Sequence, residues 1–330
     1  MKLVLFGFEV PGSLLSDLRK QFDGVYEFEE FNPRHFDARL ISKAEVLVLV
    51  SSNAEAISKA STCKWIHSWS AGVDDYLSLE VFRSAAAPIL TNSAGSYGTE
   101  ISEHVFAMIF AFTRGMKTIV SNQEKKRWEV PINHKEGIEL SEVRGKTMGI
   151  IGLGHVGLEI ARTAKTFGLN VLGVKRDATK ELRVAALGQF VDEIFSLDGI
   201  PTVLTRSDFV VNALPLTNET KNLFNSSNFS KFKEGALFLS VGRGGTVVEK
   251  DLIEALQRGN LGRAALDVFS TEPLPGNSLL WKMENVLISP HVAGRSDSQF
   301  AKAFSVLKDN LTRYSEGRDL SNRIDVKAGY

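Results

Sequence analysis

The sequence predicts an α/β protein built from two doubly wound parallel-sheet domains. Its length of 330 residues is what about two domains of ordinary size require. Strand-like and helix-like stretches alternate along the chain, and this alternation is typical of βαβ units. Several strand candidates, such as Val46–Val50, are continuous apolar runs of the kind that parallel sheets bury on both faces.

The first part of the chain contains one such alternating unit. Its helices are expected at Pro11–Phe22 and Ala54–Lys59, and proline is favoured near a helix start. Its strands are expected at Leu3–Phe8, Val46–Val50, Trp65–Trp69 and near Ile89–Asn92.

A long helix is expected over Gly98–Asn122, with Gly115 as the one interruption of the pattern. Its apolar residues cover two faces, whereas a surface helix needs only one apolar stripe. The faces comprise Ile101, Val105, Met108, Ile109, Phe112, Met116 and Val120, and then Phe106 and Phe110. The second face indicates a homodimer interface, although a helix buried within one chain would show the same pattern.

A second sheet is expected to begin at Thr147, and the amphipathic stretch Arg295–Glu316, closed by Gly317, is expected to return to the first domain. The predicted division is therefore 1–96 with 294–330 as one domain, and 97–293 as the other. The strands expected in the second sheet are Thr147–Gly152, Asn170–Val174, Phe209–Leu214, Ala236–Val241, Ala264–Asp267 and Val286–Ser289, with a weaker one near Phe190–Glu193.

The glycine pattern Gly152-x-Gly154-x-x-Gly157 lies between a predicted strand and a predicted helix. This context favours a Rossmann dinucleotide site over a glycine-rich turn that binds nothing. The three glycines would permit the tight turn, the close approach of a pyrophosphate, and the packing of helix on strand. The N–H groups at the helix start would receive the phosphates.

Composition narrows the functions further. The 39 basic and 39 acidic residues cancel, so no bulk field favours nucleic acid or an anionic membrane. No apolar run approaches the roughly 18 residues that span a bilayer, and the N-terminus does not resemble a signal peptide. The single cysteine, Cys63, cannot form an internal disulfide and is expected to be a small buried apolar residue. We therefore expect a cytoplasmic protein.

Three strands of the second sheet are followed by polar residues suited to catalysis: Arg243, Glu272 and His291. The carboxyl ends of parallel strands share one edge, so these residues should converge beside the dinucleotide. An arginine can bind a carboxylate, and an imidazolium can donate the proton that completes reduction of a carbonyl. The glutamate would fix the ring's tautomer and favour its charged form. The alternatives are a surface salt bridge and a structural histidine.

The chain resembles the D-isomer-specific 2-hydroxyacid dehydrogenases over nearly its whole length. This resemblance implies a flavodoxin-like, discontinuous substrate domain and a homodimer. It also implies that Arg243 binds a 2-oxoacid, that His291 is the acid/base and that Glu272 is its partner. The matching segments are Ser70–Asp74, Gly152–Gly157, Asn212–Pro215 with Thr220, Val241–Gly244, Ala265–Phe269 with Glu272-Pro273, and Ser289–His291.

The resemblance implies the ligand contacts as well. The backbone amides around Ala71, Gly72 and Val73 would hold the substrate carboxylate, and Asp267 would contact the nicotinamide carboxamide. No metal is expected. The further cofactor contacts are expected at His155, Val156, Leu214, Pro215, Thr220, Val241, Gly242 and Gly294.

The second strand of the cofactor domain predicts which dinucleotide is used. NAD sites place an acidic residue at the end of this strand, but here the strand ends in Lys175 and Arg176. Asp177 comes one or two positions late. We expect the two cations to pair with the 2′-phosphate of NADP(H), with NAD(H) as a possible second cofactor; solvated surface charges are the alternative.

The sequence thus predicts an NADPH-preferring reductase of small 2-oxoacids, of the glyoxylate/hydroxypyruvate type. The alternative is a non-enzymatic NAD(H)-sensing protein, similar to a corepressor, on the same scaffold. Pocket size would depend on side chains near Tyr97, Trp128 and Arg295, and Trp128 would be either a packing anchor or a binding residue.

Overall fold

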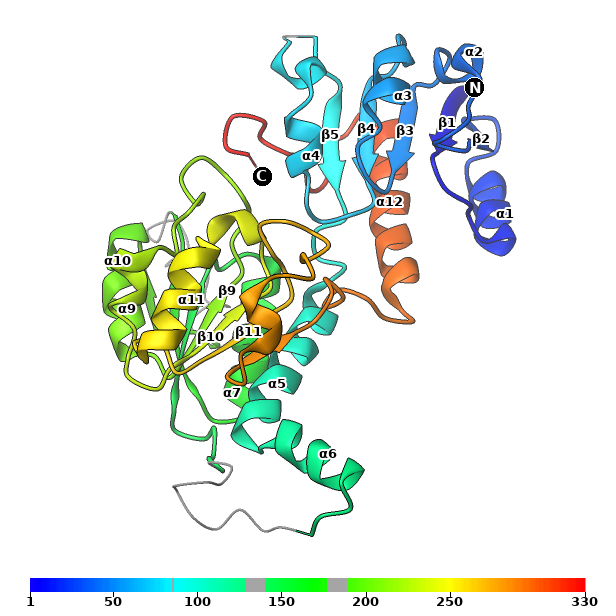
Figure 1. Ribbon diagram of the computed structural model, residues 1–330. Helices are drawn as coiled ribbons and strands as arrows, with labels where there is room; N and C mark the ends of the chain where they lie inside the picture. Colours follow the sequence, from blue (N-terminus) through cyan, green and yellow to red (C-terminus); the bar gives the residue numbers. More distant parts are fainter. Residues whose placement is uncertain (85, 129–139, 177–188, 330) are drawn as a thin grey trace. The chain divides into compact units, whose positions relative to one another are not determined.

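The computed structural model describes residues 1–84, 86–128, 140–176 and 189–329 (Figure 1). The chain folds into two compact units. Met1–Ser96 and Ser296–Tyr330 together form the first, here called the terminal unit, and Tyr97–Arg295 form the second, the central unit.

The terminal unit is a parallel sheet of five strands in the order β2-β1-β3-β4-β5, which is the flavodoxin-like order. Its interior strands β3 and β4 are buried at every residue, which explains their apolar runs. The strands are β1 (Lys2–Phe6), β2 (Tyr26–Glu30), β3 (Val46–Leu49), β4 (Trp65–Ser68) and β5 (Ile89–Asn92). Strand β2 was not predicted, because it is not a continuous apolar run: it alternates buried aromatic residues with glutamates, as a half-buried edge strand does.

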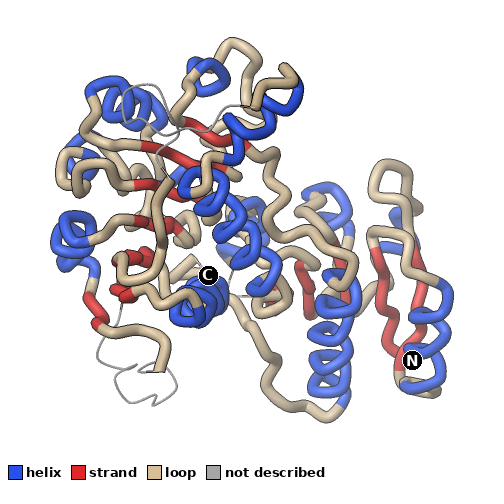
Figure 2. The backbone as a smooth tube through the Cα atoms, turned by 90° about the horizontal axis from the view of Figure 1, so that it is seen from below, coloured by secondary structure: helices blue, strands red, loops and turns tan. Residues whose placement is uncertain are grey.

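Helices cover this sheet (Figure 2), and the last helix of the chain, α12, is one of them (Figure 1). Ala303, Phe304, Leu307 and Leu311 of α12 are buried in the core of the terminal unit. The Tyr26 hydroxyl donates a hydrogen bond of 2.9 Å to the carbonyl oxygen of Leu311. The helices are α1 (Gly12–Gln21), α2 (Ala38–Ile41), α3 (Ala54–Lys59), α4 (Asp74–Leu77) and α12 (Gln299–Ser315).

The central unit is a parallel sheet of seven strands in the order β12-β11-β10-β9-β6-β7-β8. The strand order reverses between β6 and β9, and ligands of doubly wound sheets bind at such a point. The strands are β6 (Thr147–Ile151), β7 (Asn170–Val174), β8 (Glu193–Phe195), β9 (Phe209–Asn212), β10 (Leu237–Ser240), β11 (Arg263–Leu266) and β12 (Val286–Ile288). The predicted fold class of two parallel α/β domains is confirmed.

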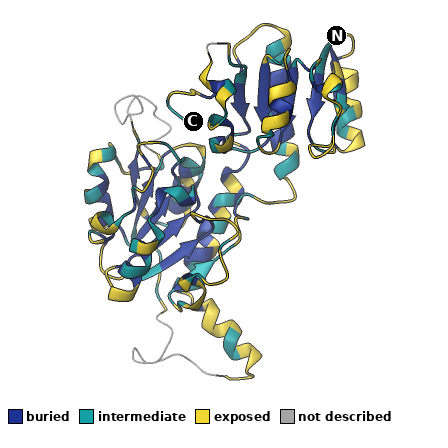
Figure 3. Ribbon diagram, turned by 45° about the horizontal axis from the view of Figure 1, so that its top comes forward, coloured by how far each residue is buried: buried dark blue, intermediate teal, exposed yellow. Residues whose placement is uncertain are grey.

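The predicted helix over Gly98–Asn122 is wrong in one respect, because two helices replace it. Gly115 has a φ of 62°, a left-handed conformation that ends α5 (Gly98–Thr113) before α6 (Met116–Glu124) begins. Both apolar faces of α5 contribute buried residues, but Met116, Ile119 and Val120 of α6 are exposed. Figure 3 shows most of α6 in the colour of exposed residues. In the part of the central unit that the structure describes, the other helices are α7 (His155–Thr166), α9 (Ile200–Arg206), α10 (Ser226–Phe229) and α11 (Glu249–Arg258). Among all described residues, no helix has both the length and the apolar character that crossing a membrane requires.

Candidate active site

The glycine loop joins β6 to α7 beside the point where the strand order reverses. A Cβ atom at Gly157 would lie 2.1 Å from the carbonyl oxygen of Gly152, so only glycine lets the helix approach the loop. A Cβ atom at Gly154 would meet nothing within 4 Å, so open space lies in front of the loop. Within the described residues, the amides of His155 and Val156 have no acceptor. This cradle fits a pyrophosphate.

Arg243, Glu272 and His291 follow β10, β11 and β12, three adjacent parallel strands. The loops after these strands pack against each other, because a Cβ atom at Gly244 would lie 1.9 Å from the backbone of Phe269. The Phe269 amide in turn donates to Glu272 Oε1 at 2.9 Å. The loops after β10 and β11 therefore meet at the carboxyl edge of the sheet, which also carries the glycine loop.

Glu272 and His291 are in direct contact: His291 Nδ1 lies 2.7 Å from Glu272 Oε2. An ionised carboxylate only accepts hydrogen bonds, so we assign the proton to Nδ1. The remaining nitrogen, Nε2, is then the one that can exchange a proton with a ligand. The side chain of His291 is half exposed and that of Glu272 about one-third exposed, so the pair lies at a surface that solutes can reach.

Asp267 holds the turn that carries His291. Its backbone carbonyl accepts from the His291 amide at 2.9 Å, and its carboxylate accepts from the amides of Val292 (2.9 Å) and Ala293 (3.0 Å). His291 has a φ of 53°, in the left-handed region that non-glycine residues seldom adopt. The backbone amides of three successive residues thus donate to Asp267, and these hydrogen bonds stabilise the unusual backbone conformation of His291.

Two residues that were not predicted from the sequence complete this arrangement. The Ser289 hydroxyl donates to Asp267 Oδ1 at 2.5 Å, and His104 Nε2 of α5 lies 2.9 Å from the same hydroxyl. Asp267 is 1% exposed, so these contacts replace water around a buried carboxylate. Ser289 stands next to Pro290 in the matching segment, but nothing in the sequence pairs it with a histidine 185 residues away.

The loop after β9 is built on Asn212 and Thr220. The Asn212 amide donates to the hydroxyls of Ser240 (3.1 Å) and Thr246 (2.8 Å), which ties this loop to the Arg243 loop. The Thr220 hydroxyl donates to the Pro215 carbonyl at 2.6 Å. Predicted cofactor residues Leu214 and Thr220 are buried, as are Val241 and Gly242, which follow β10. All of them lie at the carboxyl edge.

Lys175 and Arg176 directly follow β7, as expected. Arg176 Nη2 lies 2.9 Å from Glu219 Oε2, so a carboxylate from the loop after β9 faces this cation. Glu219 was not predicted, because it follows β9 and no local pattern links it to the end of β7. Asp177, the late carboxylate near that strand, lies outside the described residues.

Gly294 and Tyr97 lie together in the central unit, because a Cβ atom at Gly294 would approach the Tyr97 ring to 3.2 Å. Arg295 is exposed, and its amide donates to the carbonyl of Val292 at 2.9 Å. Trp128 is 97% exposed, which is not the environment of a packing anchor within a single chain.

Ala71, Gly72 and Val73 belong to the terminal unit, where they link β4 to α4. The Asn92 amide donates to the Ala71 carbonyl at 2.6 Å, which fixes the loop against β5. In the described part of the chain, the N–H groups of these three residues have no acceptor. Successive free amides form a concave site for an anion such as a carboxylate.

A buried histidine lies beneath this loop. Thr91 Oγ1 accepts from Trp65 Nε1 at 2.8 Å, so its own proton points to His67 Nδ1 at 2.8 Å. His67 Nε2 then donates to Ser93 Oγ at 3.2 Å, and Ser93 donates to the Ser68 carbonyl. Burial lowers the pKa of His67 to about 3, so the ring is neutral and the chain of hydrogen bonds has one direction.

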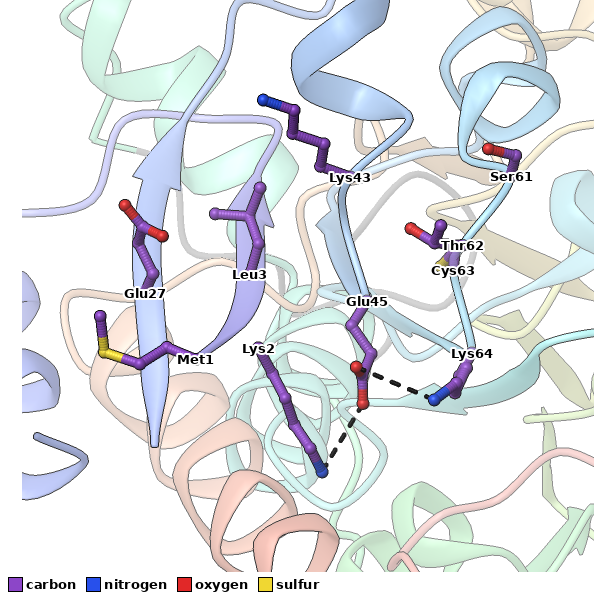
Figure 4. Close-up of a pocket in the computed structure, with 10 residues that line it drawn as sticks. All are labelled: Met1, Lys2, Leu3, Glu27, Lys43, Glu45, Ser61, Thr62, Cys63 and Lys64. Atoms are coloured by element: carbon purple, nitrogen blue, oxygen red, sulfur yellow. Dashed lines mark ion pairs between the residues drawn. The ribbon is translucent and has the colours of Figure 1, made fainter. Parts of the chain in front are cut away.

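A cavity of about 760 Å³ opens at the opposite, amino-terminal edge of the five-stranded sheet (Figure 4). Its centre holds Glu45, which pairs with Lys2 (3.6 Å) and Lys64 (3.9 Å). Cys63 also lines it, but burial raises the pKa of this thiol to about 12, so it is no nucleophile near neutral pH. Among the described residues, no group of three His, Cys, Asp or Glu side chains could hold a metal ion.

Comparison with known proteins identifies the family. Residues 106–293 match the family model described as D-isomer specific 2-hydroxyacid dehydrogenase, NAD binding domain. The chain is similar to glyoxylate/hydroxypyruvate reductase B of Shigella dysenteriae, with 30% identity over 96% of this chain and 95% of the other. It is also similar to D-3-phosphoglycerate dehydrogenase of Archaeoglobus fulgidus, with 30% identity over 87% of this chain, but it spans only 53% of that protein.

Among solved structures, the chain is similar to the NADPH-dependent glyoxylate/hydroxypyruvate reductase of Sinorhizobium meliloti in complex with NADP and sulfate. The TM-score is 0.82, and the identity is 28% over the whole of both chains. The chain therefore belongs to the D-isomer specific 2-hydroxyacid dehydrogenases, which are NAD(P)-dependent oxidoreductases. The resemblance inferred from the sequence motifs is confirmed.

Proposed function

We propose that this protein reduces a small 2-oxoacid of the glyoxylate/hydroxypyruvate type to the D-2-hydroxyacid, with NADPH preferred. The observation that carries the proposal is the 2.7 Å contact between His291 and Glu272 at the sheet edge that also carries the glycine loop. An imidazole held by a carboxylate beside a dinucleotide cradle has the chemistry of a carbonyl reductase.

The residues of the candidate site have separate roles in the proposed reaction. The dinucleotide supplies a hydride when bound. Arg243 binds the 2-oxoacid through its guanidinium. The role expected of the Ala71–Val73 amides, as a site for a carboxylate, stays a prediction. His291 Nε2 gives a proton to the carbonyl oxygen as the hydroxyl forms, and Glu272 stabilises the imidazolium before that transfer. Asp267 Oδ2 accepts from a single amide among the contacts above, so it retains a lone pair for a carboxamide N–H.

The preference for NADPH rests on Lys175 and Arg176, which supply positive charge at the end of β7. The relative from Sinorhizobium meliloti is NADPH-dependent and was solved with NADP. Replacing both cations with glutamine should raise the KM for NADPH more than the KM for NADH. A higher kcat/KM with NADH in the unaltered protein would contradict the preference.

The test of the activity is the loss of NADPH absorbance with glyoxylate, hydroxypyruvate, pyruvate and phenylpyruvate in turn. We expect turnover with the small substrates glyoxylate and hydroxypyruvate. Tight NADPH binding without turnover of any 2-oxoacid would favour the corepressor-like alternative. A parallel assay of the His291→Ala protein links any turnover to the proposed acid/base.

We also propose that the protein is a homodimer, formed through the apolar side of α6. Met116, Ile119 and Val120 are 44–50% exposed on one helix, and a second copy of this chain would cover them. Light scattering of the eluting protein should give twice the chain mass. The Ile119→Glu and Val120→Glu double variant should give the chain mass, while Lys117→Glu serves as a control on the same helix.

A further inference from the structure

We propose that Glu219 sets the balance between the two nicotinamide cofactors by competing with the 2′-phosphate of NADPH for Arg176. This inference rests on the proposed function, because it concerns the dinucleotide that the glycine loop would bind. It assigns a specificity role to a residue in the loop after β9, whereas the acidic residue of NAD sites follows the second strand of the domain, here β7.

Arg176 and Glu219 form an ion pair that spans the carboxyl end of β6. Arg176 follows β7 and Glu219 follows β9, and these two strands lie on either side of β6. The glycine loop leaves the carboxyl end of β6, so the contact between Arg176 Nη2 and Glu219 Oε2 spans the edge from which the loop rises. The adenosine ribose of a dinucleotide is bound at this edge, next to the end of the second strand.

The position of Glu219 is fixed by its neighbours in the chain. The Thr217 amide donates to Thr220 Oγ1 at 2.8 Å, and the Thr220 hydroxyl donates to the Pro215 carbonyl. Thr220 is buried, so the turn is anchored on the sheet while Glu219 projects from it. The Glu219 and Arg176 side chains remain 57% and 36% exposed, so a ligand can reach both.

The two cofactors differ only at the 2′ position of the adenosine ribose, and Glu219 should weaken the binding of one and favour the binding of the other. A 2′-phosphate carries negative charge, so it needs Arg176 and is repelled by the Glu219 carboxylate. A 2′-hydroxyl can donate a hydrogen bond to the same carboxylate, as acidic residues of NAD sites accept one. Glu219 should therefore narrow the preference for NADPH that Lys175 and Arg176 create.

The test compares dissociation constants of NADPH and NADH, measured by quenching of protein fluorescence without any substrate. In Glu219→Gln, the dissociation constant of NADPH should fall by about three- to tenfold, the order expected from removing one solvated charge near a phosphate. That of NADH should stay the same or rise. Glu234→Gln removes an equivalent exposed charge elsewhere in the central unit and should change neither constant.

A second background separates competition from simple repulsion. In Arg176→Gln, NADPH binding should weaken, and adding Glu219→Gln should then improve it less than in the unaltered protein. Two results would overturn the inference while the proposed function stands. One is that Glu219→Gln improves NADPH binding equally in both backgrounds. The other is that Glu219→Gln and Glu234→Gln change the ratio of the NADPH and NADH dissociation constants equally. If the unaltered protein bound neither dinucleotide, the proposed function itself would fail.

Discussion

The backbone amide of His291 donates a 2.9 Å hydrogen bond to the carbonyl oxygen of Asp267, and the carboxylate of the same aspartate accepts from the next two amides. The proposed acid/base is therefore placed by its backbone as well as by Glu272. The side chain of Ser289 adds a fourth donor to Asp267, and His104 orients that hydroxyl.

Ser289→Ala should lower kcat roughly tenfold, because losing one hydrogen bond to a buried carboxylate loosens the turn by about that factor. The KM for the 2-oxoacid should change little, because Ser289 contacts Asp267, whereas Arg243 is the residue proposed to bind the substrate. Steady-state kinetics would measure both. Ser289→Thr keeps the hydroxyl and should restore the rate; if it does not, size rather than hydrogen bonding at this position matters.

His291→Asn and Glu272→Gln should each reduce kcat. Removing a general acid costs about 10²- to 10⁴-fold, and the Glu272 variant should lose less because the imidazole remains. The dissociation constant of NADPH should hold steady in both, which shows that the site is intact. Turnover of glyoxylate by His291→Asn at the parental rate would rule out the assigned acid/base.

Arg243→Gln should act mainly on substrate binding. The guanidinium is proposed to hold the 2-oxoacid, so the KM should rise by one order of magnitude or more, roughly the worth of a charge-assisted pair. We expect a smaller loss in kcat. A variant whose KM is unchanged while kcat collapses would assign Arg243 to the chemical step instead.

Gly154→Ala and Gly157→Ala should separate cofactor binding from folding. An added Cβ atom at position 157 would lie 2.1 Å from the Gly152 carbonyl oxygen, so Gly157→Ala should lower Tm and abolish dinucleotide binding. A Cβ atom at position 154 has open space, so Gly154→Ala should keep its Tm and weaken only the dinucleotide. Thermal unfolding with and without NADPH measures both. Equal Tm losses would contradict the distinct roles assigned to these two glycines.

His67 should make the protein sensitive to acid. Its pKa is about 3 in the folded chain, against 6.5 for an ordinary solvated histidine, so between these values only the unfolded chain binds the proton. The free energy of unfolding should therefore fall by up to about 1.4 kcal/mol per pH unit below pH 6.5, with no contribution above it. Urea titrations at pH 7, 6 and 5 should show this slope. His67→Gln should flatten it, and an unchanged slope would assign the acid sensitivity to other groups.

Local patterns were enough to predict much of this protein. The apolar runs of β3 and β6 predict buried parallel strands, and the spacing of Gly152, Gly154 and Gly157 predicts the turn between strand and helix. Arg243, Glu272 and His291 could be grouped because parallel topology brings all carboxyl ends to one edge. These inferences need only periodicity and a general rule of sheet topology.

Only the tertiary structure decided which side chains meet across that edge. Helix propensity did not reveal that Gly115 adopts a left-handed conformation and separates α5 from α6. No local pattern joins His104 to Ser289, or Glu219 to Arg176, because each partner comes from a different crossover of the fold. Sequence determines which residues reach an edge, whereas contacts between loops depend on how far each loop extends and on the hydrogen bonds that orient it.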